Sequence, residues 1–396
     1  MGLQFLTAGE SHGPSLVAIL EGLPAGVPIS VDLINADLAR RQQGYGAGPR
    51  MKVEQDQVRI LAGLMHQGDT DKTIGSPIAF LIENKDHSKW REHHIAPFTT
   101  PRPGHADLSG TIKYGYTDLR PALERASARE TASRVAVGSA CRQLLSIFDI
   151  HIGGYVSSIG GVTANFEEIP IDQRITISRA NDLQCPDVQA ADKMRQLIRN
   201  TMDDKDTLGG IIEIIAWNVP PGLGSYVHWS RRLDSRLGAA IISIPAIKGI
   251  EFGSAFKNTR LKGTQVQDAI YLENGKLIRR SNHCCGIEGG ISNGEPIVIR
   301  AAMKPIATTL APQRTVDLLS GEETPTQYER SDFCPVPRAV VILEAMAAFV
   351  LADALLEKLG GDNLDELLIR FRALRQARLS DLPMDGIEHV FWPDSE

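Results

Sequence analysis

The sequence predicts an α+β fold in a single large domain. Short apolar runs that end at glycine or proline are typical of strands, and three longer segments are typical of helices. The two kinds are mixed without the regular strand–helix alternation of a parallel α/β fold. The 36 glycines and 22 prolines are spread over all 396 residues, so no linker divides the chain.

Seven stretches are expected to form strands, because each is a short apolar run closed by a turn residue. In chain order they are residues 4–7, 15–20, 58–61, 78–82, 211–217, 240–244 and 297–301.

Three segments are expected to form helices, at residues 128–148, 190–204 and 338–359. Ser127, with Glu130 three residues later, predicts a capping box at the start of the first helix. The third helix is apolar nearly all round, so we expect it to be buried.

The chain becomes charged and irregular near its end. We therefore expect the domain to cover residues 1–370 and residues 371–396 to form a peripheral tail.

Composition excludes several classes of protein. The net charge of −6 leaves no overall basic surface for nucleic acid, so a binder of small anions would have to gather its arginines at one place. Five cysteines without a CxxC pair indicate reduced thiols in a cytoplasmic protein. No signal peptide and no uninterrupted run of about 18 apolar residues is present. The neighbouring His87, His93 and His94 lack the spacing of metal ligands, so no metal site is expected.

The motif Gly-Glu-Ser-His-Gly at residues 9–13 has three interpretations. It matches the G-x-S-x-G motif of serine hydrolases, but that motif needs a strand, a sharp turn and a helix, whereas here Pro14 and another strand-like run follow. It could be an ordinary turn with an exposed histidine. It could also be a tight loop that presents His12 to a substrate, because imidazole titrates near neutrality and can protonate a leaving anion.

Other segments combine basic residues with glycine or a helix start. Arg41 and Arg50 flank a glycine-rich loop that could bind an anion or could be solvated. Arg125 and Ser127 open the first predicted helix, where an anion or ordinary capping would fit. His105 follows a Pro-Gly turn, two residues before an aspartate that could orient it or merely satisfy it.

Taken in order, these motifs resemble the chorismate synthase family, from about residue 3 to about residue 365. The motifs that carry the resemblance are GESHG, RRQQGYG, RPGHAD, RASARETASRVAVG, IPAIKGIEFG, GGISNGEP, KPIAT and RSD. The resemblance implies a β-α-β sandwich, with helices layered against antiparallel sheets, that assembles as a homotetramer.

The family resemblance also implies a reaction. It is the anti 1,4-elimination of phosphate from 5-enolpyruvylshikimate 3-phosphate, which gives chorismate in the shikimate pathway to the aromatic amino acids. Reduced FMN is required although nothing is oxidised overall. No reductase domain or Rossmann motif is visible, so we expect an external source of reduced flavin, with NADPH at most an indirect reductant.

The resemblance assigns roles to individual residues. His12 would protonate the departing phosphate, His105 would interact with the reduced flavin, and Asp332 would relay a proton. The substrate would be held by Ser11, Arg41 and Arg50. The flavin-contacting segments correspond to Arg125, Ala126, Ser127, Ala239, Ala240, Gly289, Lys304, Pro305, Ile306, Ala307, Thr308 and Arg330.

The sequence departs from the family pattern at two of these places. Ala47 stands where the family usually has an arginine that is associated, with Arg41, with NADP or phosphate, and Ala239 replaces a more typical glutamine. Loss of one charge-assisted hydrogen bond can cost about 1.5–3 kcal/mol. Two alternatives to an active lyase therefore stay open, a catalytically impaired homologue that keeps the fold and a serine hydrolase.

Overall fold

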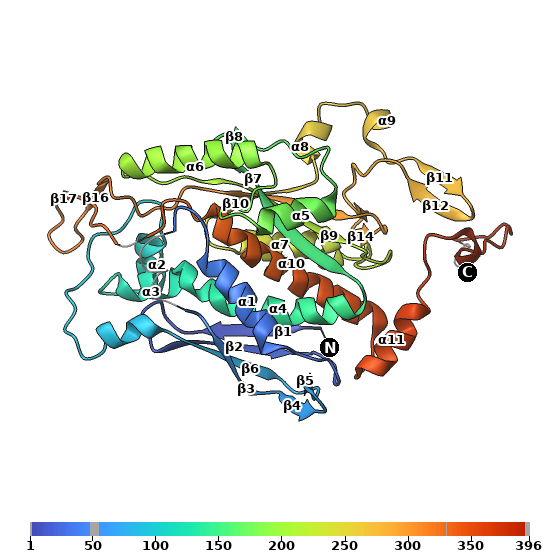
Figure 1. Cartoon of the computed structure of the whole chain (residues 1–396), viewed down its shortest axis with the longest axis horizontal. Helices are drawn as coiled ribbons and strands as arrows, with labels where there is room; N and C mark the ends of the chain where they lie inside the picture. Colours follow the sequence, from blue (N-terminus) through green and yellow to red (C-terminus); the bar gives the residue numbers. More distant parts are fainter. Residues whose placement is uncertain (1, 48–54, 330, 393–396) are drawn as a thin grey trace.

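Two antiparallel sheets enclose a layer of helices in the computed structural model, which describes residues 2–47, 55–329 and 331–392 (Figure 1). The first sheet has the strand order β1 (Gln4–Ala8), β2 (Ser15–Glu21), β6 (Ile78–Glu83) and β3 (Val58–Ala62). The second has the order β10 (Ile247–Phe252), β15 (Ile297–Met303), β9 (Gly210–Trp217), β7 (His151–Ile159) and β8 (Val162–Thr163).

The helical layer consists of α1 (Val31–Gln42), α4 (Thr131–Ile147), α7 (Leu233–Ile242) and α10 (Val336–Leu359). Helix α4 packs on the first sheet, α10 packs on β7 and β9 of the second, and α4 and α10 pack on each other. The expected β-α-β sandwich is therefore confirmed.

The remaining elements lie around this sandwich. The helices are α2 (Asp107–Tyr114), α3 (Arg120–Ala126), α5 (Ile171–Arg179), α6 (Val188–Asp203), α8 (Ala255–Asn258), α9 (Gly263–Val266) and α11 (Leu364–Arg372). The hairpins are β4 (Leu64–Gln67) with β5 (Thr70–Thr73), β11 (Ile270–Glu273) with β12 (Lys276–Arg279), β13 (Ile287–Glu288) with β14 (Ile291–Ser292), and β16 (Arg314–Val316) with β17 (Glu323–Pro325).

Helix α10 is the predicted buried helix. Within the described ranges it is the one helix long and apolar enough to cross a membrane, and 89% of its apolar window is buried inside the protein. Its single fully buried carboxylate, Glu344, accepts hydrogen bonds from Arg40 at 2.6 and 2.9 Å and from the backbone of Gly154. A buried charge that is paired in this way is tolerated in a core, so α10 is a core helix of a folded domain.

Two expectations about local structure are wrong. Residues 240–244 were expected to be a strand but lie at the end of α7 and just beyond it, because Leu233, Leu237 and Ile241 are buried at a helical spacing of four. The expected capping box also does not form. Ser127 caps a short 3-10 turn instead, and the Glu130 carboxylate accepts a hydrogen bond from Thr7 at 2.7 Å.

The contact between α4 and α10 gives a stability prediction. A Cβ at Gly138 would lie 2.3 Å from the carbonyl oxygen of Ala345, so Gly138→Ala is expected to push the two helices apart and lower the free energy of unfolding by about 1–3 kcal/mol. Gly238→Ala in α7 is the matched control, since nothing lies within 4 Å of its added Cβ. The control is expected to stabilise by up to about 1 kcal/mol, and urea unfolding measures both. Equal effects at the two sites would contradict this close packing.

Candidate active site

The loop between β1 and β2 presents His12. Gly9 has φ of 108°, and a Cβ there would lie 2.4 Å from the carbonyl oxygen of Ser15, so the turn requires glycine. His12 Nδ1 lies 2.7 Å from Oε1 of Glu124 in α3, and the ring centroids of His12 and Trp90 are 4.2 Å apart. The side chain of His12 is 15% exposed, so the ring is held in place and still reachable.

This geometry contradicts the serine-hydrolase interpretation. Residues 9–13 connect two antiparallel strands of a hairpin, rather than a strand and a helix. The Ser11 hydroxyl accepts a hydrogen bond from Ser127 at 3.1 Å, and His12 Nδ1 is engaged by Glu124. The loop therefore lacks the strand–turn–helix context that the nucleophile needs.

Glu124 is a site residue that sequence reasoning missed, although it lies directly before the predicted Arg125–Ser127 segment. Burial, the strongest influence, would raise the pKa of Glu124, but hydrogen bonds from the ring and backbone of His12 outweigh it and hold the pKa below its usual value. The carboxylate is therefore ionised at neutral pH. The glutamate was visible in the sequence shortly before the first predicted helix, but its partner across 112 positions was not.

His105 belongs to a second cluster, built on the turn before α2. His105 Nδ1 lies 2.6 Å from Oδ1 of Asp107, and Arg102 donates to both oxygens of that carboxylate at 2.8 and 2.9 Å. Arg102 also donates to Thr308 Oγ1 at 3.1 Å. Burial would raise the pKa of Asp107, but the hydrogen bonds from Arg102 and His105 hold it far below its usual value.

Asp107→Asn is expected to lower the free energy of unfolding by about 3–5 kcal/mol at neutral pH, because Arg102 would stay buried without its carboxylate. Because the folded-state pKa is depressed, this stabilisation is present above about pH 4, the unfolded value, and is lost as pH falls towards the folded value. Denaturant unfolding should therefore show wild type and variant converging in acid. A difference that does not change with pH would contradict this role.

A third cluster holds buried arginines beside the His12 loop. Arg129 donates to both oxygens of Asp56 at 2.6 and 2.7 Å and to Asn84 at 2.8 Å. Asn84 in turn donates to the carbonyl oxygens of Glu10 and Gly13, on either side of His12. Arg41 donates to the carbonyl oxygen of Ala128 at 2.8 Å and also faces Asp56 at 3.4 Å.

The guanidinium groups of this cluster lie close enough to repel one another. Burial lowers the pKa of Arg41, and the nearby guanidinium of Arg338 lowers it further, although an arginine remains protonated at neutral pH. The side chains of Arg41 and Arg129 are 3% and 4% exposed. An anion bound here would relieve the mutual repulsion of the arginines.

Arg338, in the first turn of α10, joins the arginine cluster to Asp332. It donates to the carbonyl oxygen of Arg41 at 3.0 Å and to Oδ2 of Asp332 at 2.6 Å. Ser331, next to Asp332, donates to the carbonyl oxygen of Thr308 at 2.9 Å, and Thr308 accepts from Arg102. A single network of contacts thus connects His12 with Asp332 and His105. From the sequence alone, only the order of these residues along the chain was known.

The expected flavin-contacting residues are only partly gathered around this network. Lys304 donates to the carbonyl oxygen of Gly104 at 2.6 Å, so the segment that continues to Thr308 lies against the His105 turn. Arg125 donates to the carbonyl oxygens of Thr7 and Gly9. Ala239 and Ala240 lie in the last turn of α7, close to Ser243, whose hydroxyl accepts from Arg134 of α4.

Gly289 lies apart from the network that the described residues of the chain form. It lies at the tip of the β13–β14 hairpin, and the next residue, Gly290, accepts a hydrogen bond from Leu233 at the start of α7. Figure 1 shows this hairpin on the opposite side of the chain from α2 and α3. Arg50 and Arg330 lie outside the described residues.

Ala47 lies beside the segment that carries Asp332. The carbonyl oxygen of the preceding Gly46 accepts hydrogen bonds from the backbones of Phe333 and Cys334, at 2.9 and 3.3 Å. A longer side chain at position 47 would therefore start within the neighbourhood of Asp332 and Arg41.

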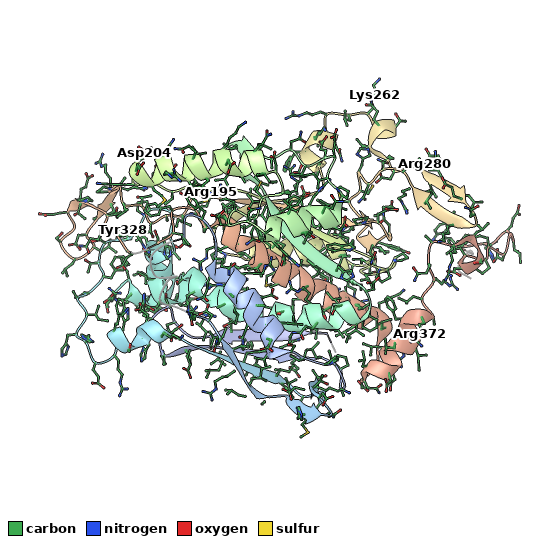
Figure 2. The ribbon with its side chains drawn as sticks, in the orientation of Figure 1. Arg195, Asp204, Lys262, Arg280, Tyr328 and Arg372 are labelled. Atoms are coloured by element: carbon green, nitrogen blue, oxygen red, sulfur yellow. The ribbon has the colours of Figure 1, made fainter. Side chains whose placement is uncertain are left out.

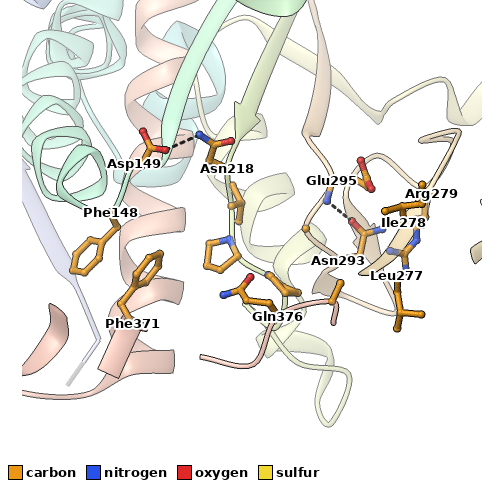
Figure 3. A pocket seen from close by; sticks show the side chains of 15 residues that line it. Phe148, Asp149, Asn218, Leu277, Ile278, Arg279, Asn293, Glu295, Phe371 and Gln376 are labelled. Atoms are coloured by element: carbon orange, nitrogen blue, oxygen red, sulfur yellow. Dashed lines mark hydrogen bonds between the residues drawn. The ribbon is translucent and has the colours of Figure 1, made fainter. Parts of the chain in front are cut away.

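Two cavities, of 440 and 710 Å³, lie elsewhere, between residues 371–382 and the loops at Pro221 and Leu277. Figure 3 shows the smaller one, which is also lined by Phe148 and Asn218. Figure 2 shows Tyr328 and Arg280 at opposite ends of the molecule. The Tyr328 hydroxyl contacts the backbone of Ser331, and Arg280 follows Arg279, which lines both cavities. The cavities are therefore separate from the cluster of His12, Asp332 and His105.

Comparisons with known proteins agree with this arrangement. The family model described as chorismate synthase matches residues 3–356. Chorismate synthase from Trichlorobacter lovleyi is 48% identical over 382 residues, covering 92% of this chain and 96% of that protein. The enzyme from Desulforudis audaxviator is 50% identical over 384 residues, with 93% and 96% covered. A crystal structure of chorismate synthase has a TM-score of 0.76 and 43% identity, and the match covers 94% of this chain and 97% of that one.

Proposed function

This chain belongs to the chorismate synthase family of carbon–oxygen lyases, and we propose that it eliminates phosphate from 5-enolpyruvylshikimate 3-phosphate to give chorismate, with reduced FMN and no net redox change. The observation that carries the proposal is the network that connects His12, the buried arginines, Asp332 and His105. The reaction is a step of the shikimate pathway to aromatic amino acids, and we place it in the cytosol.

The arginine cluster suits the charge of this substrate, which carries a phosphate and two carboxylates. Arg41 and Arg129 both contact Asp56, and Arg338 contacts Asp332. Guanidinium groups bind phosphate and carboxylate through paired hydrogen bonds, so these arginines would hold the substrate. Ser11, Arg41 and Arg50 are the residues proposed to do so, and Arg129 joins them.

His12 is proposed to protonate the phosphate as it leaves. When the C–O bond breaks, the phosphate oxygen gains charge, and a proton from His12 neutralises it. Glu124 engages Nδ1, so proton transfer to the substrate falls to Nε2. At the other end of the network, Asp332 is proposed to relay the proton that remains from the ring hydrogen lost in the elimination, and His105 is proposed to interact with the reduced flavin.

The residues around the His105 turn fit a phosphorylated flavin. Gly104 has φ of 76°, and a Cβ there would lie 3.2 Å from Lys304 Nζ, so backbone and ammonium approach each other closely. Lys304 offers a cation to a phosphate at this turn, and Arg125 and Ser127 offer a cation and a hydroxyl beside the His12 loop. When bound, reduced FMN would supply the transient electron that eases C–O cleavage. Arg125–Ser127, Lys304–Thr308 and Arg330 are proposed to hold it.

The homotetramer remains part of the proposal. Leu6 and Ile19 pair across β1 and β2 on the outer face of the first sheet, where they are 75% and 43% exposed. Such a paired apolar surface is suited to self-association. Size-exclusion chromatography with light scattering measures the mass of the assembly. A monomeric mass at micromolar protein concentration would refute the homotetramer.

Anaerobic turnover tests the function. Purified protein, 5-enolpyruvylshikimate 3-phosphate and dithionite-reduced FMN are mixed, and chorismate is followed by its absorbance. We expect product only with reduced FMN, and none with oxidised FMN plus NADPH, since the reduced flavin has an external source. Absence of chorismate together with no binding of FMN or substrate would refute the lyase.

A further inference from the structure

Glu124 contacts His12 at two points, and its backbone holds the preceding residue. Oε1 lies 2.7 Å from His12 Nδ1, and Oε2 accepts the backbone N–H of His12, also at 2.7 Å. The carbonyl oxygen of Glu124 accepts the backbone N–H of Ser11 at 3.1 Å. We propose that Glu124 is the positioning residue of the acid, which fixes the orientation and tautomer of the His12 ring and so directs Nε2 to the substrate.

The donor and acceptor count supports this assignment. An ionised carboxylate accepts hydrogen bonds and donates none. Both groups that face it must then be donors, which the backbone N–H of His12 always is. The ring satisfies the other oxygen only when Nδ1 carries a proton. Glu124 therefore favours the ring form with a hydrogen on Nδ1 and leaves exchange with the substrate to Nε2.

The surroundings of Glu124 keep it ionised and keep the ring still. The Arg120 guanidinium lowers the pKa of Glu124, and its Nε and Nη1 are buried without a hydrogen-bond partner among residues 2–47, 55–329 and 331–392. The same guanidinium lies 5.7 Å from the centroid of the Trp90 ring, on which His12 packs. His87 Nδ1 lies 2.9 Å from the carbonyl oxygen of His12. Glu124, Trp90 and His87 thus all contact His12, and together they fix the loop and the ring.

The Glu124→Gln substitution distinguishes a residue that orients the His12 ring from one that only stabilises the loop. Glutamine has nearly the same shape, but its amide offers one acceptor and one donor group. It cannot accept from both the backbone and Nδ1, so the ring must turn or adopt the form with hydrogen on Nε2 alone. Glu124→Asp keeps two acceptors on a shorter stem. Glu92→Gln is the matched control, because this carboxylate lies in the Trp90 loop and is 79% exposed.

The test has a spectroscopic and a kinetic part. Nitrogen-15 NMR of histidine-labelled protein, assigned with His12→Asn, reports the ring form, and steady-state turnover reports the reaction. We expect Nδ1–H in wild type, Glu124→Asp and Glu92→Gln, and its loss in Glu124→Gln. We expect kcat of Glu124→Gln to fall about 100-fold or more, with KM nearly unchanged and Glu124→Asp retaining part of the activity.

The kinetic part rests on the proposed function, whereas the spectroscopic part does not. If wild type shows no turnover, the lyase fails, and the ring form still decides the role of Glu124. Wild-type His12 without hydrogen on Nδ1 would overturn the inference. So would a Glu124→Gln protein with wild-type kcat, or one whose melting temperature drops while its ring form stays unchanged.

Discussion

His12→Asn is expected to lower kcat by about 10²–10⁴-fold, with little change in substrate binding. The effect follows from the loss of the proton that His12 Nε2 is proposed to give to the departing phosphate. Asparagine is a suitable replacement because its amide can still donate to Glu124, which holds Nδ1 at 2.7 Å in the wild type. The loop geometry should therefore survive, and only the acid should be lost. Anaerobic turnover with reduced FMN measures the effect.

His93→Asn provides the matched control for this experiment. His93 is exposed in the loop after Trp90, where its ring contacts the backbone of Arg91. The His93→Asn substitution is expected to leave kcat unchanged. If His12→Asn turned over as fast as His93→Asn, His12 would not be the acid. A rise in KM without a fall in kcat would instead assign His12 to substrate binding.

Ala47→Arg is expected to lower the KM for the substrate by roughly 10- to 100-fold, which corresponds to a charge-assisted hydrogen bond of about 1.5–3 kcal/mol. Position 47 follows Gly46, whose carbonyl oxygen is bonded to the backbone of Phe333, next to Asp332. An arginine side chain from this position would reach the same anion as the buried Arg41. Steady-state kinetics with reduced FMN measures the change.

Ala47→Gln separates charge from size. Glutamine is long and polar but uncharged, so it should gain little, and the gain of arginine should weaken as salt is added. A gain of equal size with glutamine would show that contact rather than charge was missing. If wild type is inactive and Ala47→Arg is active, the chain is a catalytically impaired homologue. If wild type is active and neither substitution helps, Arg41, Arg129 and Arg338 supply enough positive charge without the family arginine.

The sequence was a poor guide where side chains from other elements decide the structure. Strand β7 was missed because Gly153 and Gly154 interrupt its apolar pattern. In the fold, a Cβ at these positions would lie within 2.7 Å of Ile175 and 2.3 Å of Ile214, so neighbouring elements fill the space that the glycines leave. Helix α1 was missed because Arg40 and Arg41 look solvated, whereas Glu344 and Asp56 pair with them inside the protein.

By itself the sequence determined the family, the α+β class, most strands of the two large sheets and the long buried helix, because local apolar periodicity and the order of motifs carry that information. It also predicted roles in the reaction for His12, His105 and Asp332. Only the tertiary structure decided which groups meet. Glu124 reaches His12 across 112 positions, and Arg338 reaches the backbone of Arg41 across 297. Such pairs form because packing of α3, α4 and α10 removes charged groups from water. Each buried charged group then needs a partner, and local sequence patterns do not predict which residue that partner is.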